Sequence, residues 1–216
     1  MKIRNRLCHV LAITSALAAA DVSEASPPVP QAGAVLHLKS DRTRGEEVFV
    51  GCKSCHGADG SGEDRGDTPA IAGQHRSVVI KELVDFQNGV RWDVRMERVA
   101  DQHRLPLPQD LSDVSAYIAS MPVQPTSDVG DGLLIKHGRA IYAQLCVSCH
   151  GREAAGSDAR QVPRLAGQSY QYLLRQMYNS VDRRRPNLAG RHIALFRRFA
   201  RDEFVGTADY LSRLAP

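Results

Sequence analysis

Aromatic residues are scarce in this sequence. They make up 6% of its 216 residues, and only one of them is a tryptophan. Glycine and proline are more frequent, with 17 and 11 copies, which indicates a large share of loops. No segment alternates convincingly between apolar and polar residues, so no strands are predicted. A chain with few bulky side chains has difficulty closing a large core, which is a hint that something else fills the interior.

Long hydrophobic runs are also lacking, with one exception near the N-terminus. Three basic residues precede an apolar stretch over residues 7–20, and small residues follow it. This order is typical of a secretory signal peptide. Fourteen residues of helix span about 21 Å, too short for the roughly 30 Å core of a bilayer. We expect residues 1–25 to be removed, with cleavage after Ala20 or Ala25, and the mature protein to be periplasmic. An uncleaved membrane anchor is the alternative.

Cysteine is sparse too, and five copies are too few for a disulfide scaffold. Cys8 lies inside the expected signal peptide, which leaves four cysteines in the mature chain. These four form two Cys-x-x-Cys-His-Gly motifs that begin at Cys52 and Cys146, 94 residues apart. The same displacement relates other identical residues, namely Pro69 and Pro163, Gly73 and Gly167, and Gln74 and Gln168. The chain is therefore a tandem duplication.

The stretch between the two copies is rich in proline and glycine, which neither a helix nor a central strand tolerates. We therefore expect two domains, residues 26–121 and 136–216, joined by a linker over residues 122–135. Apolar residues recur at helical spacing within each copy. The predicted helices cover residues 44–50, 77–88 and 111–120 in the first copy and residues 137–145, 170–181 and 204–214 in the second.

Each motif offers two thiols and an imidazole. Four interpretations are possible: zinc binding, a redox dithiol, a plain disulfide and covalent heme attachment. A zinc ribbon pairs two Cys-x-x-Cys units about 15–20 residues apart, which does not fit this spacing. A redox dithiol favours a strand–helix setting, which the sequence does not offer. Heme attachment uses every residue, with vinyl groups bonded by Cys52, Cys55, Cys146 and Cys149 and iron coordinated by His56 and His150. We predict two covalently attached heme c groups, which also fill the interior.

The chain resembles the tandem two-heme class I cytochromes c, soluble periplasmic proteins built from two fused cytochrome domains. The resemblance rests on the two heme motifs, the repeated proline and Ala-Gly-Gln segments, and a tyrosine in the last helix of each copy. It implies an all-α fold in which each domain wraps around its heme. It also implies that the carbonyl groups of Pro69 and Pro163 accept hydrogen bonds from the proximal histidines and orient their rings.

In that family a methionine from a loop before the last helix binds the iron on the distal side. Met96 lies in such a stretch of the first copy and is the predicted ligand, with His103 as its competitor. The second copy offers no equivalent methionine, since Leu188 lies in the loop and Met177 lies on the preceding helix. If the first copy carries a three-residue insertion, His192 falls opposite Met96. We therefore predict His192 as the second distal ligand, with a five-coordinate iron as the alternative.

Charge is divided unevenly between the copies. Residues 26–121 hold 11 basic and 14 acidic residues, whereas residues 136–216 hold 14 basic and 6 acidic residues. A secreted heme protein without a recognition motif is not expected to bind nucleic acid. Surfaces of one sign speed encounters with partners of the opposite sign. We therefore predict an acidic redox partner for the second domain, with membrane-bound oxidoreductases or oxidases among the partners.

These features together predict an electron carrier. A thioether ligand favours reduced iron, so a second heme with two histidine ligands is expected at the lower potential. Electrons would then enter through the second domain and leave through the first. An enzyme with an accessible second heme, reducing peroxide or oxidising thiosulfate, is the alternative, and a heme-based sensor would need a linked signalling domain.

Overall fold

The computed structural model describes residues 31–63 and 66–215, and this part of the chain is helical. An isolated antiparallel bridge between Ser157 and Val162 is the only β pairing in these two ranges. The expected all-α fold is confirmed. The predicted signal peptide, with Cys8, lies outside the described residues.

Eleven helices occur in the described residues, and each predicted helix is among them. In the first half of the chain they are α1 Ala32–Leu36, α2 Arg42–Phe49, α3 Lys53–His56, α4 Arg76–Gln87, α5 Val94–Ala100 and α6 Pro108–Ser120. In the second half they are α7 Ile135–Leu145, α8 Val147–His150, α9 Tyr170–Val181, α10 Gly190–Phe196 and α11 Arg201–Ser212. The shorter helices α1, α3, α5, α8 and α10 were not predicted, because fewer than two turns show no periodic pattern.

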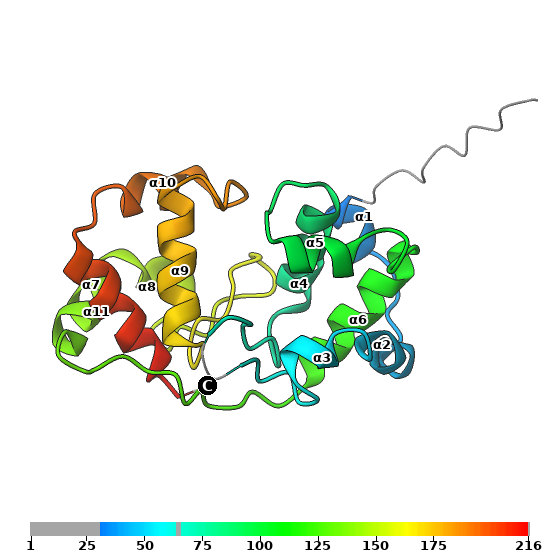
Figure 1. Cartoon of the computed structure of the whole chain (residues 1–216), viewed down its shortest axis with the longest axis horizontal. Helices are drawn as coiled ribbons and strands as arrows, with labels where there is room; N and C mark the ends of the chain where they lie inside the picture. Colours follow the sequence, from blue (N-terminus) through cyan, green and yellow to red (C-terminus); the bar gives the residue numbers. More distant parts are fainter. Residues whose placement is uncertain (1–30, 64–65, 216) are drawn as a thin grey trace, which may run out of the picture.

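The helices pack in two separate groups, which lie next to each other in Figure 1. We call the group α1–α6 the first domain and the group α7–α11 the second domain. In the first domain α6 packs on α2 and α4, and in the second α11 packs on α7 and α9. Each domain therefore has its own core, and the chain between Ser120 and Ile135 is not helical.

A close helix crossing organises each domain, and glycine makes it possible. A Cβ atom at Gly45 of α2 would lie 2.1 Å from the carbonyl oxygen of Asp113 on α6. A Cβ atom at Gly138 of α7 would lie 1.8 Å from the carbonyl oxygen of Gly206 on α11. Both separations are far inside van der Waals contact, so only glycine allows these backbones to approach. The duplication seen in the sequence is therefore also present in the packing.

Aromatic rings pack beside each of these crossings. Phe49 lies 5.3 Å from Tyr117 in the first domain, and Tyr142 lies 5.6 Å from Tyr210 in the second, measured between ring centroids. Four of the aromatic residues of the chain thus pack where α2 meets α6 and where α7 meets α11. Phe49 and Tyr142 are fully buried in their cores.

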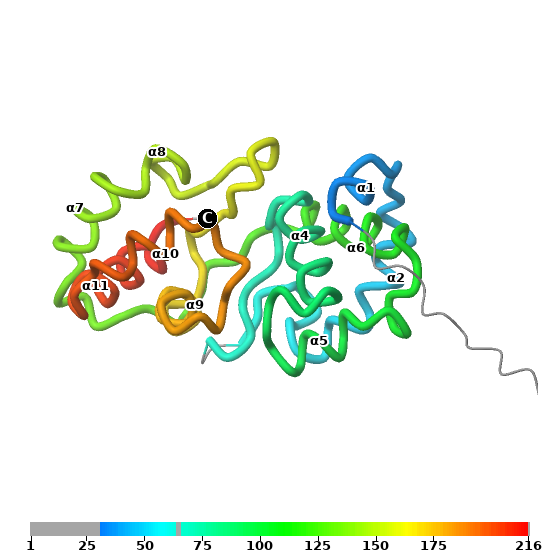
Figure 2. Tube along the Cα trace, turned by 90° about the horizontal axis from the view of Figure 1, so that it is seen from above, coloured from blue at the N-terminus to red at the C-terminus, as the bar shows by residue number. Residues whose placement is uncertain are grey.

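Loops of both domains form one part of the interface between them, as the view in Figure 2 shows. Gln168 of the second domain accepts a hydrogen bond from the Ala70 amide (3.1 Å) and donates one to the Ala70 carbonyl (2.8 Å). Gln74 of the first domain makes the same pair of bonds with the backbone of Arg164, at 3.0 and 3.1 Å. The interface therefore has an approximate twofold symmetry.

Candidate heme sites

Both heme motifs lie on short helices, α3 and α8, that each end at the histidine. Gly57 and Gly151 follow with φ of 79° and 80°, a left-handed conformation that stops the helix. None of the four motif cysteines is in a disulfide. Cys52 and Cys146 each precede the helix by one residue and pack against the core of their domain. The two thiols and the imidazole of each motif thus come from one helical turn.

The motif histidines, which are the predicted proximal ligands, are buried and hydrogen-bonded in the same way. The Nδ1 atom of His56 lies 2.9 Å from the Pro69 carbonyl oxygen, and that of His150 lies 3.2 Å from the Pro163 carbonyl oxygen. A ring nitrogen that donates to a carbonyl leaves the other nitrogen, Nε2, as the metal-binding lone pair. Burial also lowers the pKa of both histidines, which favours the neutral form that coordinates metal. The expected contact of each proline carbonyl with the ring of its motif histidine is confirmed.

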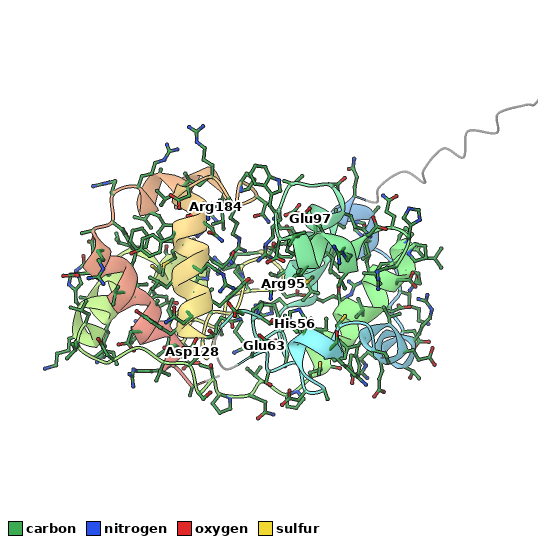
Figure 3. All side chains as sticks on the ribbon, in the orientation of Figure 1. His56, Glu63, Arg95, Glu97, Asp128 and Arg184 are labelled. Carbon is green, nitrogen blue, oxygen red and sulfur yellow. The ribbon has the colours of Figure 1, made fainter. Side chains whose placement is uncertain are left out.

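Met96 lies on α5 rather than in a loop, which corrects the sequence prediction about its surroundings. Asp93 caps this helix by accepting hydrogen bonds from the amides of Arg95 and Met96, at 3.0 and 3.2 Å. The Met96 side chain is half-buried, and the adjacent Arg95 acts electrostatically on His56. Figure 3 shows Arg95 near His56 on the side of the first domain that faces the second. His103, the competing candidate, is exposed.

His192 holds the matching position in the second domain. Met96 is the third residue of the seven-residue helix α5, and His192 is the third residue of the seven-residue helix α10. Seven residues separate α5 from α6, whereas four separate α10 from α11, so the first copy is longer by three residues at this point. Arg191, the counterpart of Arg95, acts electrostatically on His150. The three-residue insertion inferred from the sequence is therefore present.

The rings of His150 and His192 face each other at 6.0 Å between centroids, with an interplanar angle of 70°. Two imidazoles that bind one metal from opposite sides, each about 2 Å away, have centroids roughly 6 Å apart. Burial first, and then the charges of His150 and Arg191, lower the pKa of His192 to about 4. Its Nδ1 is buried and has no hydrogen-bond partner among the described residues. The residues present therefore fit a heme iron between these two rings.

The other candidates in this region do not reach the site. Met177 is buried in the core of the second domain with Leu173 and Phe204, as its helical position predicted. In residues 31–63 and 66–215, no group of three or more histidine, cysteine or acidic side chains is arranged to hold a metal ion.

A model of the cytochrome c family matches residues 43–122 and 135–202, which is more than half of the chain. The chain belongs to the cytochrome c family. Cytochrome c4 of Azotobacter vinelandii is 27% identical over 170 residues, covering 71% of this chain and 78% of that protein. A thiosulfate dehydrogenase electron acceptor of Stutzerimonas stutzeri is 27% identical over 204 residues, covering 85% and 92%.

The solved structure of reduced cytochrome c4 from Pseudomonas stutzeri has the same fold. It superposes with a TM-score of 0.72 over 82% of this chain and all of that chain, at 24% identity. The match to two tandem class I domains confirms the fold class expected from the sequence. This cytochrome c carries two covalently attached heme c groups, one on each Cys-x-x-Cys-His motif, and transfers electrons. Its described residues include no helix that is both long and apolar enough to cross a membrane.

Sequence reasoning missed the polar groups that join the two domains. Gln74 and Gln168 belong to a repeated Ala-Gly-Gln segment, so the repeat itself marked them, but its purpose appears only in the contacts. Glu82, Arg91 and Asn187 form a second interdomain cluster. The 94-residue displacement relates Arg91 to Arg185 of the same cluster, whereas nothing in the sequence distinguished Glu82 or Asn187 from a solvated surface.

Proposed function

We propose that this protein is a periplasmic electron carrier whose two hemes differ in their distal ligands, Met96 on the first and His192 on the second. The observation that carries the proposal is the shared third position of these residues on the equivalent helices α5 and α10. A thioether stabilises ferrous iron relative to imidazole, so the first heme has the higher potential. Electrons therefore enter through the second domain and leave through the first.

The surface around α10 supports an acidic electron donor. Six arginines on and beside this helix are exposed and form no ion pair within the described residues: Arg183, Arg184, Arg191, Arg197, Arg198 and Arg201. They surround the segment that carries His192, so a negatively charged partner is drawn to the second heme. The relative that accepts electrons from thiosulfate dehydrogenase supports a donor that oxidises a small sulfur compound.

Rapid-reaction kinetics test this docking. The rate at which an acidic redox protein such as flavodoxin reduces the second heme falls as salt rises, and it falls further in the Arg183→Glu/Arg184→Glu variant. Lys39→Glu, a charge reversal on the first domain, is the control and leaves the rate unchanged. A rate that is insensitive to both salt and the double substitution contradicts this part of the proposal.

Low-temperature EPR of the fully oxidised protein tests the ligands. We expect two low-spin signals in the wild type, one of which becomes high-spin in His192→Ala and the other in Met96→Ala. A high-spin signal in the wild type would mean an open iron. The protein would then be an enzyme with a substrate-accessible second heme, to be assayed with peroxide and thiosulfate.

Redox titration gives the order of the two heme potentials. Equal or reversed potentials contradict the proposed direction of electron transfer.

A further inference from the structure

A cluster of charged side chains crosses the domain boundary at Glu82 of α4. Its Oε2 atom accepts hydrogen bonds from Arg91 Nη1 at 2.7 Å and from Asn187 Nδ2 at 2.9 Å. Its Oε1 atom accepts one from Arg185 Nη2 at 3.1 Å. Asp85, one turn further along α4, accepts a second bond from Asn187 Nδ2 at 2.8 Å. The first domain therefore binds two residues of the second domain with one pair of acidic side chains.

This cluster is largely removed from water. The side chains of Arg91, Arg185 and Glu82 are 12%, 15% and 20% exposed. Ion pairs at this depth are screened less than surface pairs, and removing one partner leaves a buried charge without compensation. Each ion pair between Glu82 and an arginine is therefore costly to break, unlike an exposed surface pair.

Arg185 and Asn187 both lie in the segment of residues 182–189, which connects α9 to α10. Figure 2 shows this connection beside the first domain. On its own side the segment is held by bonds from the Arg184 and Arg185 amides to the Asn179 carbonyl oxygen, at 2.8 and 3.0 Å. The helix that follows has no buried residue and packs chiefly on α9. Within the second domain α10 packs on α9 and, through Phe196 at its end, on Phe199 and Phe204.

The cluster also includes contacts of its two arginines with side chains of α9. Arg91 donates to the hydroxyl of Tyr172 at 2.8 Å, and Arg185 donates to the Gln176 side chain at 3.0 Å. Arg185 is thus held both by Gln176 of its own domain and by Glu82 of the first domain.

We propose that Glu82 of the first domain is a positioning residue for the distal ligand of the second heme. By holding Arg185 and Asn187, it fixes the start of α10 and with it the ring of His192 opposite His150. The inference rests on the proposed ligation by His192. A side chain of the first domain therefore helps to keep the distal ligand of the second heme in place.

Carbon monoxide binding to the fully reduced protein tests this inference, because the gas binds only when the distal ligand leaves the iron. The His192→Ala variant identifies the phase that belongs to the second heme. We expect Glu82→Gln and Arg185→Gln to increase the rate of this phase by about tenfold, and Arg185→Lys to increase it less. The low-spin signal of the Met96 heme serves as the check that each variant is folded.

Three controls separate positioning from general effects. Arg184→Gln makes the same change at the neighbouring exposed residue, and Glu47→Gln does so on the exposed face of α2. Gln168→Ala weakens domain docking at the opposite part of the interface. The first two leave the rate within about twofold of the wild type, and Gln168→Ala increases it less than Glu82→Gln does.

Two results overturn the inference, and they are distinguishable. If Gln168→Ala opens the second heme as much as Glu82→Gln, or if neither Glu82→Gln nor Arg185→Gln opens it, Glu82 contributes to docking only and the proposed ligands stand. If the wild type already binds carbon monoxide as fast as His192→Ala, His192 is not a ligand, and the proposed function fails together with the inference.

Discussion

Gln74 and Gln168 form a reciprocal pair across the domain boundary. Each side chain hydrogen-bonds the backbone amide and carbonyl of the residue that follows the partner domain's heme-site proline. Those prolines, Pro69 and Pro163, accept the hydrogen bonds of the proximal histidines. A short covalent and hydrogen-bonded route therefore links the proximal side of each heme site to the other domain.

Replacing Gln168 with alanine should weaken docking of the two domains. The substitution removes two hydrogen bonds, worth about 2 kcal/mol together, which raises the undocked population by roughly 30-fold. Native-state proteolysis of the segment between Ser120 and Ile135 measures this population. Gln171→Ala, at an exposed position on α9, is the control, and equal cleavage of both variants would contradict the prediction.

The crossing of α7 and α11 should not tolerate a methyl group. Gly138→Ala places a Cβ atom 1.8 Å from the Gly206 carbonyl oxygen, so the helices must separate. We expect a loss of about 3 kcal/mol in the free energy of unfolding of the second domain, measured by denaturant titration followed through the heme absorbance. Gly190→Ala in the same domain meets no atom within 4 Å and should leave stability almost unchanged.

The difference in heme potential should depend on one side chain. In His192→Met the second heme gains the kind of thioether ligand proposed for the first, so its potential should rise by more than about 100 mV and the gap between the two potentials should narrow. Spectroelectrochemical titration measures both potentials. Met177→Leu, a core substitution on α9, should leave both potentials in place, and a gap that survives His192→Met would exclude His192 as its origin.

Glu82 should make the stability of the protein depend on acidic pH. Burial opposes its ionisation, but the charges of Arg91, Arg185 and Lys81 outweigh burial and lower its pKa from 4.5 to about 2. A carboxylate with a lowered pKa stabilises the folded state fully above its unfolded pKa, and this stabilisation is lost as pH falls from about 4.5 toward 2. It amounts to about 3 kcal/mol.

Urea unfolding of wild type and Glu82→Gln at a series of pH values measures this effect. The difference in unfolding free energy between the two proteins should be largest near pH 6 and should shrink as pH falls through this window. A difference that is independent of pH would show that the ionised form of Glu82 is not what stabilises the domain contact.

The sequence alone determined the local chemistry. Two Cys-x-x-Cys-His motifs at a constant displacement predicted heme attachment and duplication, because these residues are close together in the sequence. The helical spacing of apolar residues and the resemblance to two-heme cytochromes predicted the all-α fold. The prediction of His192 as the distal ligand of the second heme needed an assumed insertion. The structure supplies that insertion as three additional residues between α5 and α6.

Only the tertiary structure decided how the domains meet and what each domain contributes to the other's site. Gln74 bonds a residue 90 positions away, and Glu82 bonds residues more than 100 positions away. Such contacts follow no periodicity, because the relative placement of two domains depends on the shapes of both surfaces together. The short helices that carry Met96 and His192 were hidden for a similar reason, since a helix of seven residues is held by its surroundings rather than by its own sequence.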